Sequence, residues 1–158
     1  MKLSKTKAVV FVGMVAAVYA ALSLMPGLSV LSFGPVQLRI AEAMSALALL
    51  TPWAIPGLTI GCFLANLGSP MMVVDLPFGT LATLIATLLT YLLRKKPALA
   101  MLMPVIANGV IIGATISFYT DAGFSLIINM ALVAAGEAVA CYVFGLPLYR
   151  ILKKNFTK

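Results

Sequence analysis

Residues 8–26 read AVVFVGMVAAVYAALSLMP, an apolar run that follows Lys2, Lys5 and Lys7. A helix of about 20 apolar residues spans the hydrocarbon core of a bilayer, so this run predicts a transmembrane helix. A secretory signal peptide also begins with basic residues and an apolar stretch. Because the later apolar runs of the chain are equally hydrophobic, we expect the first run to be retained as a helix.

Further apolar runs follow the first one and predict the remaining helices, at residues 36–51, 56–67, 77–93, 99–118 and 124–149. With the first run, they predict an all-α integral membrane protein, a compact bundle of six transmembrane helices. The second and third runs are shorter than the roughly 17 residues of a full crossing. We expect them to cross a thinned region or to be covered by neighbouring helices. Pro52 and Pro56 discourage continued helix, so a tight connection is expected between these two runs.

The composition excludes a soluble protein. Hydrophobic residues make up 63% of the chain and charged residues only 9%, whereas soluble domains average about a quarter charged residues. The net charge of +7 does not indicate a nucleic-acid partner, because the basic residues form short clusters between apolar runs. Residues 1–158 are expected to form a single domain in the lipid bilayer, with no room for a separate ATPase or catalytic domain.

Motifs for catalysis and metal binding are missing from the sequence. The chain has no histidine, and Cys62 and Cys141 lie inside apolar runs, where a cysteine usually behaves as a small hydrophobic residue. The sequence contains no phosphate-binding glycine motif, no nucleophile with a plausible base and no paired carboxylates on one helix. We therefore expect no enzymatic activity in this chain, no metal site and no cofactor.

Three basic clusters predict the orientation of the bundle. They are Lys2 to Lys7 before the first run, Arg94 to Lys96 between the fourth and fifth runs, and Arg150 to Lys158 after the sixth. Six crossings place all three clusters on one side, which the positive-inside rule assigns to the cytoplasm. Five or seven crossings would place one cluster on the opposite side. Both termini are therefore expected in the cytoplasm.

The remaining polar residues gather in the outer half of a bundle with this orientation. They are Gln37, Arg39 and Glu42 in the first two turns of the second run, Asn66 and Asp75 around the following loop, Asn108 in the fifth run, Tyr119 and Asp121 in the next loop, and Glu137 in the sixth run. A carboxylate at membrane depth costs about 2.5–3.5 kcal/mol on insertion scales and is normally paired or functional. The set predicts an outward-facing polar cavity.

Four of these charged residues also have a purely structural interpretation. Glu137 either accepts an interhelical hydrogen bond from Asn108 or binds the edge of a ligand. Arg39 and Glu42 are three residues apart, so they either pair with each other or face the cavity. Asp75 either caps the fourth helix, contacts a ligand or does both.

Small residues recur at a spacing of four in several runs, as Ala16 and Ala20, Ala17 and Ala21, Gly57 and Gly61, and Gly109 and Gly113. This spacing lets helix backbones approach closely. For the glycine pairs of the third and fifth runs we expect packing inside the bundle. For Ala16, Ala17 and Ala20 of the first run we expect a docking surface for another membrane protein.

Several stretches of the sequence resemble a known family. They are Val36–Ala43 (VQLRIAEA), Thr51–Leu58 (TPWAIPGL) with the following Gly61 and Cys62, and Asp75–Thr83 (DLPFGTLAT). The chain resembles the queuosine-precursor transporter (QueT) family along nearly its whole length. Members of this family are substrate-binding S components of energy-coupling factor (ECF) transporters.

The resemblance implies a function, a location and partners. In this superfamily a six-helix S component captures a vitamin-like solute from outside, in the plasma membrane of a prokaryote. It then docks on a membrane coupling subunit, and two cytoplasmic ATPases supply the energy. The solute implied here is a queuosine precursor or queuine, which are 7-deazaguanine bases.

The polar residues suit such a base. Its N1–H and exocyclic amino group lie side by side, so one carboxylate can accept both hydrogen bonds, as it does from a guanidinium group. Glu137 with Asn108 is expected to bind this polar edge, with Asp75 or Glu42 closing the outer side. The other residues expected at the site are Arg39, Gln37 and Asn66.

Three alternatives remain open at this stage. The chain could be an S component for another vitamin, such as thiamine or a flavin. It could be a stand-alone secondary transporter, which would need ion-coupling groups and usually an internal repeat. It could also be a membrane assembly subunit.

Overall fold

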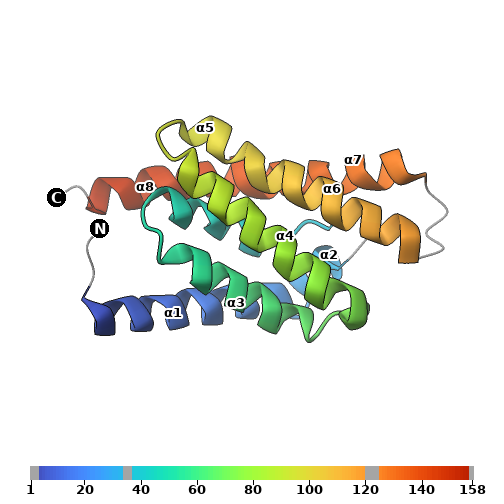
Figure 1. Cartoon of the computed structure of the whole chain (residues 1–158), viewed down its shortest axis with the longest axis horizontal. Helices are drawn as coiled ribbons and strands as arrows, with labels where there is room; N and C mark the ends of the chain where they lie inside the picture. Colours follow the sequence, from blue (N-terminus) through green and yellow to red (C-terminus); the bar gives the residue numbers. More distant parts are fainter. Residues whose placement is uncertain (1–3, 34–36, 120–124, 157–158) are drawn as a thin grey trace.

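The computed structural model describes residues 4–33, 37–119 and 125–156, with side chains up to Lys154. Helices joined by short turns and loops make up this part of the chain, which contains no strand, and this confirms the expected all-α class (Figure 1). Its helices are α1 (Lys5–Leu24), α2 (Leu28–Ser32), η1 (Ile40–Leu49), α3 (Ala54–Asn66), α4 (Met72–Leu92), α5 (Pro97–Ala100), α6 (Leu102–Tyr119), α7 (Leu126–Ala138), η2 (Val139–Gly145) and α8 (Leu146–Phe156). Of these, η1 is a 3₁₀ helix and η2 a π-helix.

Four helical segments of the described chain are long and apolar enough to cross a membrane, at Lys5–Leu24, Met72–Leu92, Pro97–Tyr119 and Leu126–Lys154. Two further apolar helices are shorter, η1 with 10 residues and α3 with 13. They correspond to the two runs that the sequence marks as too short for an ordinary crossing. The two short helices are therefore the segments for which length alone does not establish a crossing.

The described basic residues lie at one end of the molecule. The start of α1, the turn between α4 and α5, and the end of α8 all lie toward the left of Figure 1. These segments carry Lys5, Lys7, Arg94, Lys95, Lys96, Arg150, Lys153 and Lys154. The turn between α3 and α4, the end of α6 and the start of α7 lie at the opposite end. Lys2 and Lys158, which the sequence analysis included in two of the clusters, lie outside the described residues.

The second predicted helix, residues 36–51, is wrong in its type and its start. The structure has a 3₁₀ helix from Ile40 to Leu49, and Val36 lies outside the described residues. Gln37 adopts φ 46° and Arg39 is extended, so both precede the helix instead of forming its first turns. A 3₁₀ helix rises about 2.0 Å per residue against 1.5 Å in an α-helix, so ten residues span about 20 Å.

The fourth helix begins earlier than predicted, at Met72 instead of Pro77. Asp75 is therefore inside the first turn, and the residue at the N-cap position is Met71, which makes no side-chain cap. The interpretation of Asp75 as a helix cap is wrong for this reason. Pro77 lies inside the helix, where it removes one backbone hydrogen bond close to the N-terminal end, a place in which a helix tolerates the loss.

The other predicted boundaries differ by smaller amounts, except at the last helix. The first run, 8–26, forms a helix at Lys5–Leu24, and the third run, 56–67, forms one at Ala54–Asn66. The fifth run, 99–118, corresponds to α5 and α6. The sixth run, 124–149, begins at Leu126 and continues through η2 and α8 to Phe156. The last turn of α8 carries Lys153 and Lys154, and these basic residues help to make the helix amphipathic.

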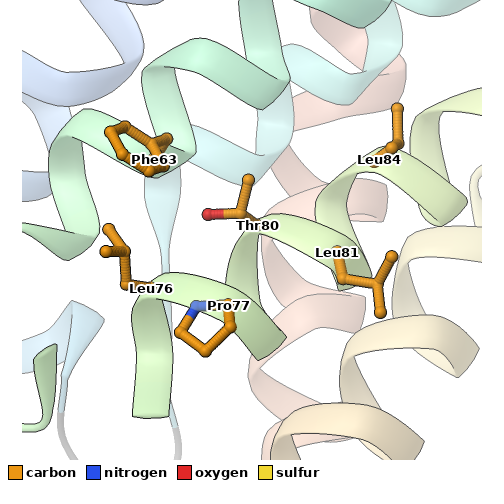
Figure 2. A pocket seen from close by; sticks show the side chains of 6 residues that line it. All are labelled: Phe63, Leu76, Pro77, Thr80, Leu81 and Leu84. Carbon is orange, nitrogen blue, oxygen red and sulfur yellow. The ribbon is translucent and has the colours of Figure 1, made fainter. Parts of the chain in front are cut away.

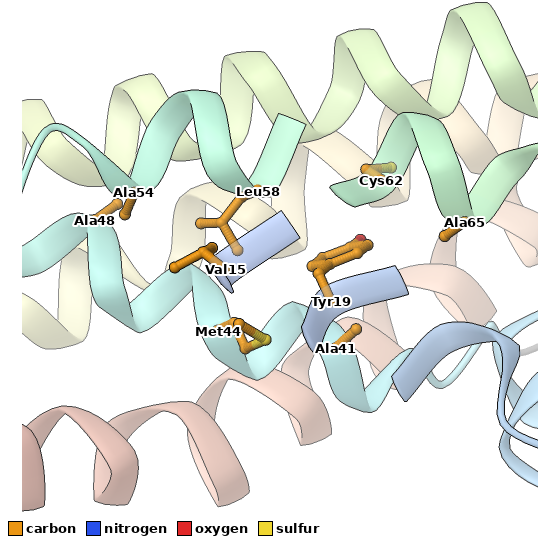
Figure 3. Close-up of a cluster of buried hydrophobic side chains, with 9 residues drawn as sticks. All are labelled: Val15, Tyr19, Ala41, Met44, Ala48, Ala54, Leu58, Cys62 and Ala65. Carbon is orange, nitrogen blue, oxygen red and sulfur yellow. The ribbon is translucent and has the colours of Figure 1, made fainter. Parts of the chain in front are cut away.

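The 3₁₀ helix η1 is the element against which most others pack. It contacts α1, α3, α4, η2 and α8. Its alanines, Ala41, Ala43, Ala46 and Ala48, are buried. Figure 3 shows Ala41, Met44 and Ala48 of η1 among side chains from α1 and α3. Short side chains on a narrow helix let neighbours approach from several sides.

Glycine pairs allow two close helix contacts, as expected from their spacing. A Cβ atom on Gly61 of α3 would lie 2.7 Å from Cβ of Tyr19 and 3.0 Å from the carbonyl oxygen of Ala16, both on α1. A Cβ atom on Gly113 of α6 would lie 2.4 Å from the Cα atom of Met130 on α7. Both pairs therefore serve packing inside the bundle, which confirms the prediction for these runs.

Candidate functional site

Glu42 of η1 is the centre of a buried hydrogen-bond network. Its Oε1 accepts a short hydrogen bond from the Tyr19 hydroxyl of α1 and another from Thr83 Oγ1 of α4 at 3.3 Å. Its Oε2 accepts a hydrogen bond from Ser45 Oγ at 3.1 Å. The Glu42 side chain is fully buried. Three hydroxyl donors therefore satisfy both carboxylate oxygens and connect η1 to α1 and α4.

Arg39 does not pair with Glu42, so that alternative interpretation is wrong. Its Nε donates to the carbonyl oxygen of Ser32 at 3.3 Å, and its Nη1 lies 3.9 Å from Cys62 Sγ. The guanidinium carbon lies 5.2 Å from the centre of the Phe33 ring. Nη2 is buried and has no hydrogen-bond partner among the described residues. Arg39 is extended and its neighbour Gln37 has a positive φ, so the guanidinium reaches the core from a non-helical segment.

Cys62 belongs to the polar network, contrary to the expectation of a simple hydrophobic residue. Its sulfur accepts hydrogen bonds from Asn66 Nδ2 at 3.4 Å and Thr83 Oγ1 at 3.2 Å. Its thiol donates to the carbonyl oxygen of Gly79 at 3.5 Å. Cys141 fulfils the expectation, because it lies in an apolar cluster with Met101 and Val105.

The turn between α3 and α4 holds Asn66 and Asp75 together. Asn66 Nδ2 donates to the backbone carbonyl oxygen of Asp75 at 2.8 Å. Ser69 Oγ donates a short hydrogen bond to Asp75 Oδ2. Asn66 Oδ1 and Asp75 Oδ1 are buried and have no hydrogen-bond partner among the described residues. A Cβ atom on Gly79 would lie 2.7 Å from Asn66 Nδ2, so glycine at this position is required to seat the asparagine.

Glu137 of α7 and Asn108 of α6 lie side by side, and both are buried. Glu137 is also close enough to Glu42 and Arg39 for their charges to interact. However, Glu137 Oε2 and Asn108 Nδ2 make no hydrogen bond of normal geometry with the described residues. The expected proximity of the two side chains is confirmed, but it leaves a carboxylate oxygen and an amide donor unsatisfied.

Five buried polar atoms of the expected site residues therefore lack a partner in the described structure. The donors are Arg39 Nη2 and Asn108 Nδ2, and the acceptors are Asn66 Oδ1, Asp75 Oδ1 and Glu137 Oε2. Leaving one such group unsatisfied in a protein interior costs about 1–3 kcal/mol, and more for a charged group. Because buried polar groups are nearly always hydrogen-bonded, these atoms are the ones suited to a polar ligand.

The remaining polar residues of the sequence analysis are placed less centrally. Gln37 is buried next to Arg39. Tyr119 ends α6 with its side chain 62% exposed, and its ring centre lies 6.3 Å from that of Phe78. Asp121 lies outside the described residues. Tyr19, Ser45, Ser69 and Thr83 were not predicted as part of the site. The spacing of Asp75, Gly79 and Thr83, four residues apart on α4, would have pointed to Thr83.

An apolar groove of about 430 Å³ lies between α3 and α4 and is separate from these polar atoms (Figure 2). Its lining consists of Phe63, Leu76, Pro77, Thr80, Leu81 and Leu84. It offers a single side-chain hydroxyl, that of Thr80. Such a lining suits lipid chains better than a polar solute.

The small residues of α1 do not share one face. Ala16 is buried against Gly61 of α3, and Ala20 is half-buried. Ala17 is exposed, as are Gly13 and Ala21, which lie four residues before and after it. Of the three alanines expected at a docking surface, Ala17 is therefore the one on the outer face of α1.

Comparison with known proteins gives two matches. A model of the QueT transporter family matches residues 9–154. The protein named "Queuosine precursor transporter QueT" of Lactococcus lactis subsp. cremoris (strain MG1363) is 41% identical over 96 residues. This alignment covers 61% of the chain and 56% of the relative, so the chain matches little more than half of the relative's length. No solved structure gives a significant match.

Proposed function

The chain, a multi-pass membrane protein, belongs to the QueT transporter family, and we propose that it is the solute-binding component of an importer for a 7-deazaguanine base. The solute is a queuosine precursor or queuine, captured from outside the cell. The similar lactococcal protein is named as a transporter of a queuosine precursor, and this supports the proposed solute.

The observation that carries this proposal is the pair formed by Glu137 and Asn108. A carboxylate oxygen and an amide donor are buried side by side without partners among the described residues. The N1–H and exocyclic amino group of a 7-deazaguanine donate in parallel to one carboxylate. The neighbouring carbonyl oxygen of the base accepts a hydrogen bond from an amide such as Asn108 Nδ2. One ligand edge thus satisfies both orphaned groups.

Glu137 Oε2 has no hydrogen bond within normal distance and angle limits among the described residues, although Asn108 lies close enough to interact with the carboxylate. The buried cation in its vicinity, Arg39, contacts Ser32, Cys62 and Phe33 instead. A neutral pair of N–H groups on a ligand stabilises the carboxylate without adding a buried charge. Arg39 Nη2 is a further buried donor without a partner among the described residues, and Gln37, two residues before it in sequence, is also buried.

The membrane arrangement that we propose has six crossings and both termini in the cytoplasm of a prokaryotic cell, in a single domain covering residues 1–158. The common end of the basic residues supports this orientation (Figure 1). The two short helices, η1 and α3, complete the count because both are apolar and packed among the longer segments. Their length suits a locally thinned bilayer.

Energy for uptake comes, in this proposal, from partners of the ECF type. A membrane coupling subunit docks on the outer face of α1, where the small residues Gly13, Ala17 and Ala21 are exposed at a spacing of four. Two cytoplasmic ATPases drive the cycle through that subunit. The chain itself contributes solute recognition and no catalysis.

The test is calorimetry of the detergent-purified chain with queuine, its biosynthetic precursors, guanine, thiamine and riboflavin. We expect binding of 7-deazaguanine bases and a loss of at least about tenfold in affinity for Glu137→Gln, because the amide presents a donor to the ligand's N–H groups. Thermal unfolding serves as the control for folding. Unchanged affinity in a folded Glu137→Gln variant would reject Glu137 as the residue that binds the base edge. Binding of thiamine or riboflavin, without binding of any 7-deazaguanine base, would mean that the solute is that vitamin instead.

A further inference from the structure

Three carboxylates and one guanidinium are the buried charged groups of the described chain, namely Glu42, Asp75, Glu137 and Arg39. Burial of a charge without a partner is strongly unfavourable. Arg39 is close enough to both Glu42 and Asp75 for their charges to interact, but its own side-chain contacts go to Ser32 and Cys62. A buried carboxylate that lacks donors is therefore suited to a positively charged group on a ligand.

The hydrogen bonds of the three carboxylates decide which of them is available to that charge. Both oxygens of Glu42 already accept hydrogen bonds from hydroxyl groups. Glu137 has Asn108 beside it, a combination of acceptor and donor that suits the edge of a base. Asp75 differs from both, because the residue hydrogen-bonded to its backbone, Asn66, carries a second acceptor without a partner among the described residues, Oδ1.

We infer that Asp75 and Asn66 form a subsite for a protonated amine carried by the solute. Both side chains are at least 98% buried, and each presents an oxygen without a hydrogen-bond donor from the described protein. An ammonium group offers three donors and no acceptor. It is therefore the chemical complement of two buried acceptors, one of them charged. The inference rests on the proposed function, because the base edge is bound elsewhere, at Glu137 and Asn108.

The surrounding contacts fix the two acceptors in place. Asn66 Nδ2 donates to the backbone carbonyl of Asp75, so the amide oxygen must point away from that bond. Ser69 holds Oδ2 of Asp75, which leaves Oδ1 for the ligand. Gly79 provides the space for the Asn66 amide. The turn between α3 and α4 is thus preorganised to accept donors.

The consequence is a preference among 7-deazaguanines for those with an amine on the side chain. Calorimetry of the purified full chain compares 7-aminomethyl-7-deazaguanine with its neutral 7-hydroxymethyl analogue, which is almost the same size. We expect the amine to bind at least about tenfold more tightly, as for a hydrogen-bonded charge in a buried site. If the affinities for the amine and the hydroxymethyl analogue differ by less than about threefold, the amine subsite is overturned, while the proposed recognition of the base is not affected.

Two variants separate the subsite from the base site. Asp75→Asn keeps the shape and an acceptor for Ser69, and we expect it to bring the affinity ratio of the two compounds close to one. Glu137→Gln should lower the affinity for both compounds by a similar factor and so preserve the ratio of the two affinities. A ratio that stays the same in Asp75→Asn would overturn the subsite. If the wild-type chain binds neither compound, the proposed function itself fails, and the subsite fails with it.

A free cation is the alternative source of the same chemistry. The titrations are therefore repeated in sodium, potassium and choline chloride at equal ionic strength. Binding of the amine should not depend on which cation is present. If the hydroxymethyl analogue reaches the affinity of the amine in sodium or potassium chloride only, a bound metal cation takes the place of the amine and the inference is overturned.

Discussion

Glu42 and Glu137 are both buried carboxylates in an apolar bundle, but they differ in their hydrogen bonds. Hydroxyl groups of Tyr19, Ser45 and Thr83 satisfy both oxygens of Glu42. Glu137 Oε2 has no such partner among the described residues. The same residue type thus serves to join helices at one position and is available to a ligand at the other. From the sequence, Glu137 was expected to bind the base edge and Glu42 was one of two candidates for closing the outer side.

Replacement of Tyr19 by Phe tests the joining role of Glu42. The variant removes a hydroxyl donor from a fully buried carboxylate, and we expect a loss of about 1–3 kcal/mol in stability. The measurement is the thermal unfolding temperature in detergent.

Tyr142→Phe is the matched control for Tyr19→Phe. The Tyr142 hydroxyl also donates a hydrogen bond, to the Ala98 carbonyl oxygen at 2.8 Å, but that bond is solvent-accessible and involves no charge. We expect a clearly smaller decrease in the unfolding temperature. Equal decreases in the unfolding temperature of the two variants would mean that the buried hydrogen bond to Glu42 stabilises the fold no more than the solvent-accessible bond of Tyr142.

At the scale of the element, α1 has two faces with different tasks. Val15, Tyr19 and the backbone at Ala16 pack on α3 and η1 (Figure 3). Ala17 and Ala21 lie on the exposed face. The spacing of four residues is the same for both alanine pairs, so the pattern alone could not distinguish internal packing from docking.

Leucine substitutions on the two faces should separate these tasks. Ala17→Leu is expected to leave the unfolding temperature and solute binding near wild type and to block co-purification with the proposed coupling subunit. Ala16→Leu overpacks the contact with Gly61 and should cost about 1–3 kcal/mol in stability. Normal complex formation by a folded Ala17→Leu variant would contradict docking on this face.

At the scale of the whole molecule, the basic residues at one end and the polar turn between α3 and α4 at the other give the bundle a direction (Figure 1). The acceptors Asn66 and Asp75 lie at the end remote from the basic residues. A solute entering from that end meets the proposed amine subsite first. The orientation in the membrane therefore determines which compartment supplies the solute.

Single cysteines at Lys95 and Lys154 test this orientation. We expect a membrane-impermeant maleimide to label both from the cytoplasmic side, in inverted vesicles but not in intact cells. The native Cys62 and Cys141 can remain, because both have 0% exposure and should not react. Labelling of the two introduced cysteines from opposite sides would contradict the topology.

Most residues of the candidate site could be selected from insertion cost alone, because a polar residue in an apolar run is normally paired or functional. Asn66, Asp75, Asn108 and Glu137 were identified in this way, and the structure buries all of them. Cys62 and Thr83 were missed because a thiol and a hydroxyl are tolerated in membrane helices without special partners. Only their contacts with Glu42, Asn66 and Arg39 reveal a role.

The sequence by itself determined the all-helical membrane class, the apolar segments and the clustering of charge, because hydropathy and charge act locally along the chain. Only the tertiary structure decided the 3₁₀ form of η1, the start of α4 and the buried side of α1. It also decided which carboxylates remain without donors. These features depend on contacts between segments distant in sequence, and no local pattern records which hydroxyl group reaches which carboxylate.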